Sequence, residues 1–312
     1  MQHFEVGRQL GRHAVIVSGH SLPTEAGVDF DQAAINLWRR LRPVPLNSQS
    51  RLPIVHFSVA TGKILLLNLN PDGSIARQVL ASFASPEPSH YGQRKENRRI
   101  FVSTMTRTLS MLDVYAYLFH LGLHSPAVLE AVIVVAHAWD QGPILLNTLD
   151  PVPHSPWRSP ADKDARRKDL RPPQLGAAER EALRKAFVGG AFCINAGCGG
   201  YKALQPLLLR VEHGPAWDAA ERRELQVSAL QSWNQDFANA AGVPCFAAFP
   251  GVSTGLELSG EQPTLTVPQQ AVADRPDFSP ALAALQTCLG FCRDPWGLGL
   301  VRFDPQLANE WQ

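Results

Sequence analysis

Short runs of apolar residues recur along the chain, separated by longer stretches with helical spacing. The apolar runs predict buried strands at residues 14–18, 128–136, 191–196 and 243–249. The stretches with apolar residues every three or four positions predict helices at 31–41, 109–121, 176–187 and 216–241. Gly122 is expected to end the second helix. Strands that alternate with helices predict an α/β fold with a mostly parallel central sheet and helices on both faces.

The remaining segments predict hairpins and loops. Residues 53–60 and 63–70 flank Thr61-Gly62, which predicts a hairpin with its turn at these two residues. A second turn at 71–73 follows the hairpin, and residues 142–147 predict a short strand. Two polar stretches, 82–97 and 151–173, predict exposed loops, and we expect the second to be mobile or to be cut during activation. We therefore expect a single domain over 1–312, with a catalytic core at about 100–255 and an irregular extension at 256–312.

The composition excludes several classes of protein. Hydrophobic residues make up 45% of the chain and charged residues 18%, so a sizeable core can form. Lys and Arg number 29 against 28 Asp and Glu, and this balance favours neither nucleic acid nor an anionic membrane as a partner. The first apolar run is too short for a signal peptide, and the five cysteines form no disulfide framework or paired zinc motif. We expect a cytoplasmic chain, or one exported without a cleavable signal, that holds reduced thiols and no metal or other cofactor.

Three predicted strand ends carry glycines or polar residues. Sites in parallel α/β sheets lie beyond the carboxyl ends of the strands. The three segments there are Gly19-His20-Ser21, His137-Ala138-Trp139-Asp140 and Gly197-Cys198-Gly199-Gly200. We expect them to meet at one edge of the sheet.

Cys198 and His137 are the residues that can carry chemistry at this edge. An imidazole, whose ordinary pKa is ~6.5, can take the proton of a neighbouring thiol near neutral pH, and the thiolate can attack a carbonyl carbon. Glycines after Cys198 let backbone amides approach an oxyanion, and a helix that begins there favours the thiolate. The alternatives are a structural His137 and an inert, buried Cys198, and burial is the expectation for Cys193 inside its strand.

The order of these features resembles the caspase-like cysteine peptidases, which include caspases, metacaspases, gingipains and the self-processing domains of bacterial toxins. The resemblance covers about residues 130–255: an apolar strand and His137, a hairpin, a polar loop, then an apolar strand and Cys198. Residues 234–255 (NQDFANAAGVPCFAAFPGVSTG) are similar to the helix and strand that follow the cysteine in bacterial members. The resemblance implies a three-layer sandwich and a peptidase that acts on proteins or peptides, with Cys198 as nucleophile and His137 as general acid.

The resemblance also implies an oxyanion site near the amides of Ala138 and Gly199. The substrate pocket would be lined by Trp139, Asp140 and His20. Each also has a structural explanation: Trp139 could simply pack in the fold, His20 could belong to a turn, and Asp140 could be exposed in a loop. A role as a bacterial toxin or effector, with an inhibitor or immunity partner, follows by analogy only. Ala138 stands where the family usually has Gly, and a left-handed conformation there would be strained.

Other functions fit the same residues. Residues 196–200 (AGCGG) resemble the nucleophile elbow of an α/β-hydrolase with Cys in place of Ser, as in dienelactone hydrolases, but that fold needs a later histidine and His213 follows too soon. A third interpretation is a catalytically inactive caspase-like module that binds a partner, and Ala138, in place of the usual Gly, favours it.

Two groups outside these segments also stay open. The charged side chains of residues 151–173 form either a cation or substrate site or a solvated, self-neutralising loop. Asp140 and Asp150 either orient His137 or bind a basic substrate group, or they are exposed in loops. Cys288 and Cys292, four residues apart, are either buried or metal ligands.

Overall fold

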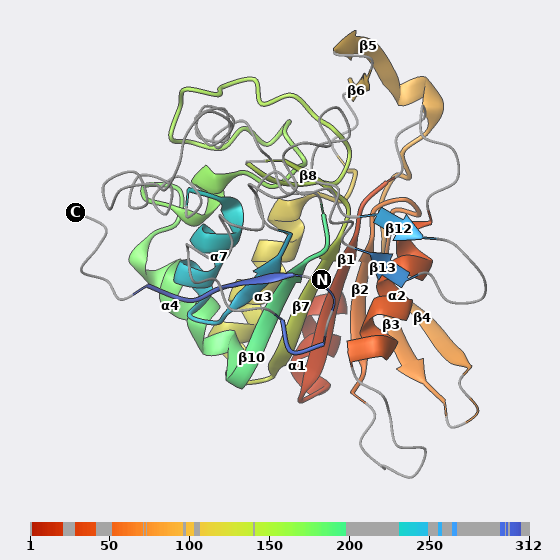
Figure 1. The fold of residues 1–312 in the computed structure, drawn as a ribbon, viewed down its shortest axis with the longest axis vertical. Helices are drawn as coiled ribbons and strands as arrows, with labels where there is room; N and C mark the ends of the chain where they lie inside the picture. The colour runs from red at the N-terminus through yellow and green to blue at the C-terminus, as the bar shows by residue number, and fades with distance from the viewer. Residues whose placement is uncertain are drawn as a thin grey trace, which may run out of the picture.

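An eight-stranded sheet forms the centre of the molecule (Figure 1). The computed structural model describes residues 2–20, 29–41, 52–70, 72, 74–95, 98–102, 107–139, 141–197, 231–248, 255–257, 264–266, 294–296, 298 and 300–306. The strand order is β14-β11-β10-β7-β1-β2-β3-β4. Strands β11, β10, β7, β1 and β2 run parallel, and β14, β3 and β4 each pair antiparallel. The predicted α/β fold with a mostly parallel sheet is confirmed.

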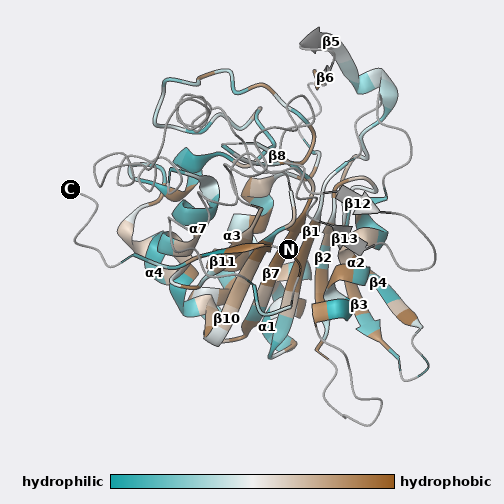
Figure 2. Ribbon diagram, in the orientation of Figure 1, coloured by the Kyte–Doolittle hydropathy of each residue, from teal (hydrophilic) through white to brown (hydrophobic). Residues whose placement is uncertain are grey.

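The sheet consists of β1 (His13–Ser18), β2 (Ile54–Ser58), β3 (Lys63–Leu69), β4 (Ile75–Ser82), β7 (Leu129–Val135), β10 (Phe187–Asn195), β11 (Cys245–Ala247) and β14 (Val301–Phe303). Separate hairpins pair β5 (Tyr91–Lys95) with β6 (Arg98–Phe101), β8 (His137–Trp139) with β9 (Gly142–Ile144), and β12 (Gly255–Glu257) with β13 (Thr264–Thr266). The central strand β7 is buried along its whole length because both of its faces are covered, and Figure 2 shows how apolar residues gather in the central strands.

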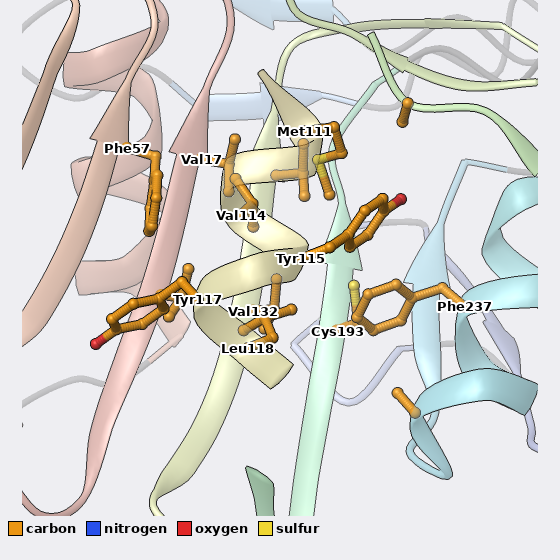
Figure 3. Packing of buried hydrophobic residues seen from close by; sticks show 14 of the residues in the cluster. Val17, Phe57, Met111, Val114, Tyr115, Tyr117, Leu118, Val132, Cys193 and Phe237 are labelled. Atoms are coloured by element: carbon orange, nitrogen blue, oxygen red, sulfur yellow. The ribbon is translucent and has the colours of Figure 1, made fainter. Parts of the chain in front are cut away.

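Helices cover both faces of the sheet, which makes it the middle of three layers. Helix α2 (Phe30–Leu41) packs on one face. Helices α3 (Met111–His124), α4 (Ala177–Ala186) and α7 (Trp233–Ala241) pack on the other face, and α1 (Gln2–Gln9) rests on α3. Figure 3 shows α3 over this second core, with Val17, Val132 and Cys193 reaching toward it from the sheet. Two short 3-10 helices, η1 (Pro88–His90) and η2 (Arg167–Leu170), lie in the connections.

Several predicted elements need correction. The helix expected over 216–241 does not run through residue 232, because Ser232 is extended and caps α7 by accepting the N–H of Gln235 at 3.3 Å. Residues 82–97 are not a plain loop, since they include η1 and β5. Parts of the sheet lie outside the expected catalytic core at about 100–255. Strands β1 to β4 precede residue 100, and β14, in the segment expected to be an irregular extension, pairs with β11 at the edge of the sheet.

Gly122 lies inside α3 and does not end it, which corrects a further expectation. The helix continues to His124 and closes at Ser125. A Cβ atom on Gly122 would overlap the carbonyl oxygen of Ala182 in α4. The glycine therefore permits the close approach of the two helices.

Gly122→Ala is expected to lower the free energy of unfolding by about 1–3 kcal/mol, because the added methyl group must push α4 away from α3. This loss exceeds what alanine contributes through its better helix propensity. Urea unfolding measures the change. Gly189→Ala is the control, since a Cβ there meets nothing within 4 Å, and its expected change is within about 0.5 kcal/mol. Equal effects of the two substitutions would show that α3 and α4 are not in close contact.

Buried histidines fasten the N-terminal helix to α3. His3 is 6% exposed and lies against Phe4 and Tyr117. His13 donates from Nδ1 to the carbonyl of Gly11 at 2.7 Å and accepts at Nε2 from the Tyr117 hydroxyl at 3.0 Å. Burial lowers the pKa of His3 to about 4 and also lowers the pKa of His13.

The chain is expected to lose stability as the pH falls from about 6.5 to about 4. In this window the unfolded chain binds a proton at His3 and the folded chain does not, so the free energy of unfolding rises with pH. The share of His3 is on the order of 2 kcal/mol. Urea unfolding at a series of pH values tests this, with His3→Phe expected to show a shallower pH dependence. Parallel curves for the two proteins would contradict it.

Candidate active site

Three strand ends meet at the carboxyl edge of the sheet, as predicted. The N–H of Gly19, after β1, donates to the carbonyl of Val135 in β7 at 3.0 Å. A Cβ on Gly19 would lie only 2.8 Å from the Cβ of Ala136. A Cβ on Gly197, after β10, would overlap the methyl group of Ala138 and lie 2.8 Å from the carbonyl oxygen of Ala136. The main chains that follow β1, β7 and β10 are therefore in contact.

Part of the predicted site lies outside the described residues: Cys198, Gly199 and Asp140, together with His213, Cys288 and Cys292. The described part includes His20, His137, Ala138 and Trp139.

His137 is the first residue of β8 and stands over the carboxyl edge of the sheet. Its half-buried imidazole packs edge-on against Phe30, with ring centroids 5.2 Å apart and planes at 88°. Phe30 is the first residue of α2. The imidazole therefore lies on the α2 side of the sheet.

A buried polar network holds the start of α2 on the sheet. The Asp31 carboxylate accepts hydrogen bonds from the hydroxyls of Ser18 and of Ser58, the latter at 2.7 Å. His56 Nε2 lies 2.7 Å from Ser18 Oγ and 3.4 Å from Asp31 Oδ1. Burial raises the pKa of Asp31, but the contacts with His56 and the two hydroxyls outweigh it and lower the pKa. Asp31 thereby fixes the position of Phe30 beside His137.

Ser18, His56 and Asp31 are the residue types of a hydrolase triad, but their geometry differs from that of a triad and suits a structural role. In a triad the serine and the carboxylate contact opposite nitrogens of the imidazole. Here both approach Nε2, and Ser18 is fully buried. Sequence reasoning missed this network. The signal was a set of polar residues inside otherwise apolar strands.

The side chain of Asn195 connects the end of β10 to α7 and to Gly197, and sequence reasoning missed this residue as well. Its side chain is buried, donates to Asn234 Oδ1 in α7 at 2.8 Å and accepts the N–H of Gly197 at 3.3 Å. The amide thus ties the end of β10 to α7. A polar residue at the end of a buried strand was the available signal.

His20 lies at the same edge but is engaged by another element. Its Nδ1 is 3.0 Å from the hydroxyl of Tyr91 in β5, and the two rings stack with their centroids 5.8 Å apart. The backbone N–H of His20 donates to the carbonyl of Leu145 at 2.8 Å. Burial lowers the pKa of His20, so the ring is neutral near pH 7. Its contact with a substrate remains a prediction.

Ala138 carries no backbone strain. Among the described residues, Ala127 and Asn147 are the non-glycine residues with positive φ, whereas Ala138 is extended within β8. The left-handed conformation that would penalise alanine is absent at this position. A Cβ on Gly197 would lie 3.2 Å from the Ala138 nitrogen, so this amide borders the chain just before Cys198.

Buried charges hold part of the segment that was expected to be an exposed loop, and we call residues 145–171 the ion-pair block. The Asp164 carboxylate accepts four backbone N–H groups, from Leu145, Leu146, Asn147 and Thr148, at 2.7–3.2 Å. Burial raises the pKa of Asp164, and the nearby Arg166 offsets part of this rise. The charges of this segment neutralise one another as expected, but Arg158, Asp162, Asp164, Arg166 and Asp169 are buried and not solvated.

Two arginines complete the ion-pair block. Arg158 donates to both carboxylate oxygens of Asp169 at 3.0 Å, and Arg166 donates to both oxygens of Asp162 at 2.6 and 3.0 Å. Burial raises the pKa of Asp169 to about 6, although Arg158 opposes it. Asp150 contributes a pair with Lys168 at 2.7 Å. These charges partner one another, and a role of Asp150 toward His137 or a substrate stays a prediction.

The ion-pair block and the hairpin that begins with His137 both contact α7. Arg167 and Arg171 both donate to the buried carboxylate of Asp236 in α7. Gly142, at φ +134° in the hairpin, leaves room for the ring of Trp233, since a Cβ there would lie 2.8 Å from it. The Trp233 indole N–H donates to the hydroxyl of Tyr115 in α3 at 2.9 Å.

Cys193 is a core residue, as predicted. It is fully buried and, in Figure 3, points into the layer that holds Tyr115 and Phe237. Burial and the neighbouring Cys245 raise the pKa of the Cys193 thiol. A buried thiol with a raised pKa is a poor nucleophile.

Within the described part of the chain, no three or more His, Cys, Asp or Glu side chains gather in a way that could hold a metal ion. None of the helices described is long and apolar enough to cross a membrane. Comparisons with protein-family models, with curated proteins and with solved structures find no match to this chain.

Proposed function

We propose that the chain is a cysteine peptidase of the caspase-like type, with Cys198 as nucleophile and His137 as general acid and base. The observation that carries the proposal is the meeting of two strands. Strands β7 and β10 are adjacent and parallel, and Gly197 packs against the main chain of Ala136 and Ala138. Gly197, the residue before Cys198 in the sequence, therefore lies beside the main chain that carries His137.

The alternation of side chains also favours the pair. Ile194 and Ala196 belong to the core on the α2 side, whereas Cys193 belongs to the core on the other side. Successive side chains of an extended chain point to opposite faces. Ala196, two residues before Cys198 in the sequence, therefore faces the α2 side, where His137 contacts Phe30.

The reaction follows from these two groups. The Cys198 thiolate attacks the carbonyl carbon of a peptide bond, and the carbonyl electrons move to oxygen. The His137 imidazolium then gives its proton to the leaving amine as the C–N bond breaks, which leaves a thioester. Water attacks the thioester, His137 takes its proton, and the thiolate leaves as the carboxylic acid is released.

Backbone amides would stabilise the oxyanion that forms in each step. The amides of Ala138 and Gly199 are the proposed donors, and the extended conformation of Ala138 costs no strain. This finding weakens the argument that Ala138 marks an inactive module. An α/β-hydrolase-type thiol hydrolase ranks below the peptidase because its histidine should follow the nucleophile.

The proposal keeps the partners that the resemblance implies. Its substrate is a protein or peptide, and a toxin or effector of this kind would require an inhibitor or immunity partner in the cell that makes it. A reducing compartment such as the cytoplasm would preserve the Cys198 thiol, whether the chain stays there or leaves without a cleavable signal.

Incubation with a mixture of peptides from a digested proteome tests the proposal, with mass spectrometry to find new peptide ends. Wild-type chain is expected to cleave a subset of these peptides and Cys198→Ala to cleave none. Hydrolysis of p-nitrophenyl acetate through Cys198 without any peptide cleavage would favour the thiol hydrolase. The absence of both reactions in folded protein would favour the interaction module.

A further inference from the structure

Trp139 is an apolar side chain that the fold leaves exposed beside His137. It follows His137 by two residues in β8, a distance of about 7 Å along a strand. Its side chain is 43% exposed, while the large aromatic residues of the core are buried. Exposure of an aromatic ring next to a reactive group is typical of a wall that contacts a ligand.

A buried arginine holds this ring in place. The Arg166 guanidinium carbon lies 4.9 Å from the centre of the Trp139 ring. The Arg166 side chain is only 3% exposed, and Asp162 and the Thr148 carbonyl fix it through hydrogen bonds of 2.6–3.0 Å. The ring is therefore fixed before any substrate binds, which reduces the entropy lost on binding.

The arginine also determines which substrate side chain suits the ring. A Trp face attracts cations, but Arg166 already occupies this interaction, so a second cation gains less from the same ring. An anion cannot reach Arg166, because the guanidinium is buried and paired with Asp162. A neutral apolar or aromatic side chain gains contact area at the ring and loses no hydration of charge.

We propose that Trp139, fixed by Arg166, forms the wall of a subsite that accepts a neutral apolar side chain near the scissile peptide bond and disfavours lysine and arginine. This inference rests on the proposed peptidase function. Among the described residues, Trp157 is another large apolar residue that is exposed, and it is not part of the proposed subsite.

A binding experiment tests the subsite without relying on catalysis. The full chain is labelled with ¹⁵N in its seven Trp indoles, and Trp139→Phe assigns the Trp139 signal. The signal is expected to move on addition of N-acetylphenylalanine amide or N-acetylleucine amide and to stay in place with N-acetyllysine amide at equal concentration. Equal movement with all three compounds, or none, overturns the subsite whatever the hydrolysis shows.

Hydrolysis of quenched peptides that differ at one position provides the second arm. Wild type is expected to prefer Phe over Lys at one position by at least about 10-fold in kcat/KM. Trp139→Ala is expected to remove most of this preference, and Trp157→Ala, at another exposed Trp, to preserve it. An unchanged preference in Trp139→Ala also overturns the subsite. The absence of all hydrolysis would contradict the peptidase, and the indole signal would still decide the subsite.

Discussion

Cys198→Ala is expected to lower kcat/KM for any peptide that the wild-type chain cleaves by at least about 10³-fold, without unfolding the chain. The substitution removes the atom that forms the thioester, and water alone replaces it poorly. His137→Ala is expected to cost nearly as much, because a nucleophile and its base act as one unit. Initial rates at equal concentrations of folded protein measure the loss.

Cys193→Ala is the matched control for this experiment. Cys193 is fully buried in β10, so its truncation leaves a small cavity that costs on the order of 1 kcal/mol and removes no reacting atom. We expect normal activity with a lower unfolding midpoint. Full activity of a folded Cys198→Ala protein would end the assignment of Cys198 as nucleophile and favour the interaction module.

Arg158→Ala is expected to lower the free energy of unfolding by about 3–5 kcal/mol. The Arg158 side chain is 2% exposed, and its guanidinium holds both oxygens of Asp169 and donates to the carbonyl of Asp162 at 3.2 Å. Its removal leaves the Asp169 carboxylate buried without its main partner. Urea unfolding at pH 7 measures the loss.

Two comparisons separate the buried charge from other causes. Arg8→Ala breaks the exposed pair with Glu5 and is expected to change stability by less than about 1 kcal/mol. The double substitution Arg158→Met with Asp169→Leu leaves no unpaired charge and is expected to cost less than Arg158→Ala alone. A loss in Arg158→Ala as small as in Arg8→Ala would show that the ion-pair block is solvated after all.

The central layers could be predicted from the sequence because their residues are buried on both faces. Strands β1 and β7, which are buried along their whole length, appear as apolar runs for this reason, and in β10 the run is confined to residues 191–194. The order of strands and helices then indicates a parallel sheet, which brought the ends of β7 and β10 together as expected. Strand β4 escaped prediction because it lies at the edge of the sheet and has one buried residue, Leu80.

The ion-pair block could not be predicted because the sequence does not show which charged residues find partners. Prolines and charges are typical of a solvated loop, yet Arg158, Asp162 and Arg166 are each buried within a hydrogen-bonded network. The contacts of Asp31 with Ser18 and His56 could not be predicted for a related reason, since they join residues far apart in the chain. The pairing of Cys198 with His137 stays a prediction.

Alkylation of Cys198 by iodoacetamide as a function of pH tests this pairing most directly, with mass spectrometry to resolve each cysteine. A thiol that shares a proton with His137 is expected to react from about pH 6, well below the ordinary thiol pKa of ~8.5. In His137→Ala the half-point should rise toward that value, while the buried Cys193 and Cys245 stay unmodified in both folded proteins. The same pH profile in both proteins, or a Cys198 that reacts only after unfolding, would contradict the dyad.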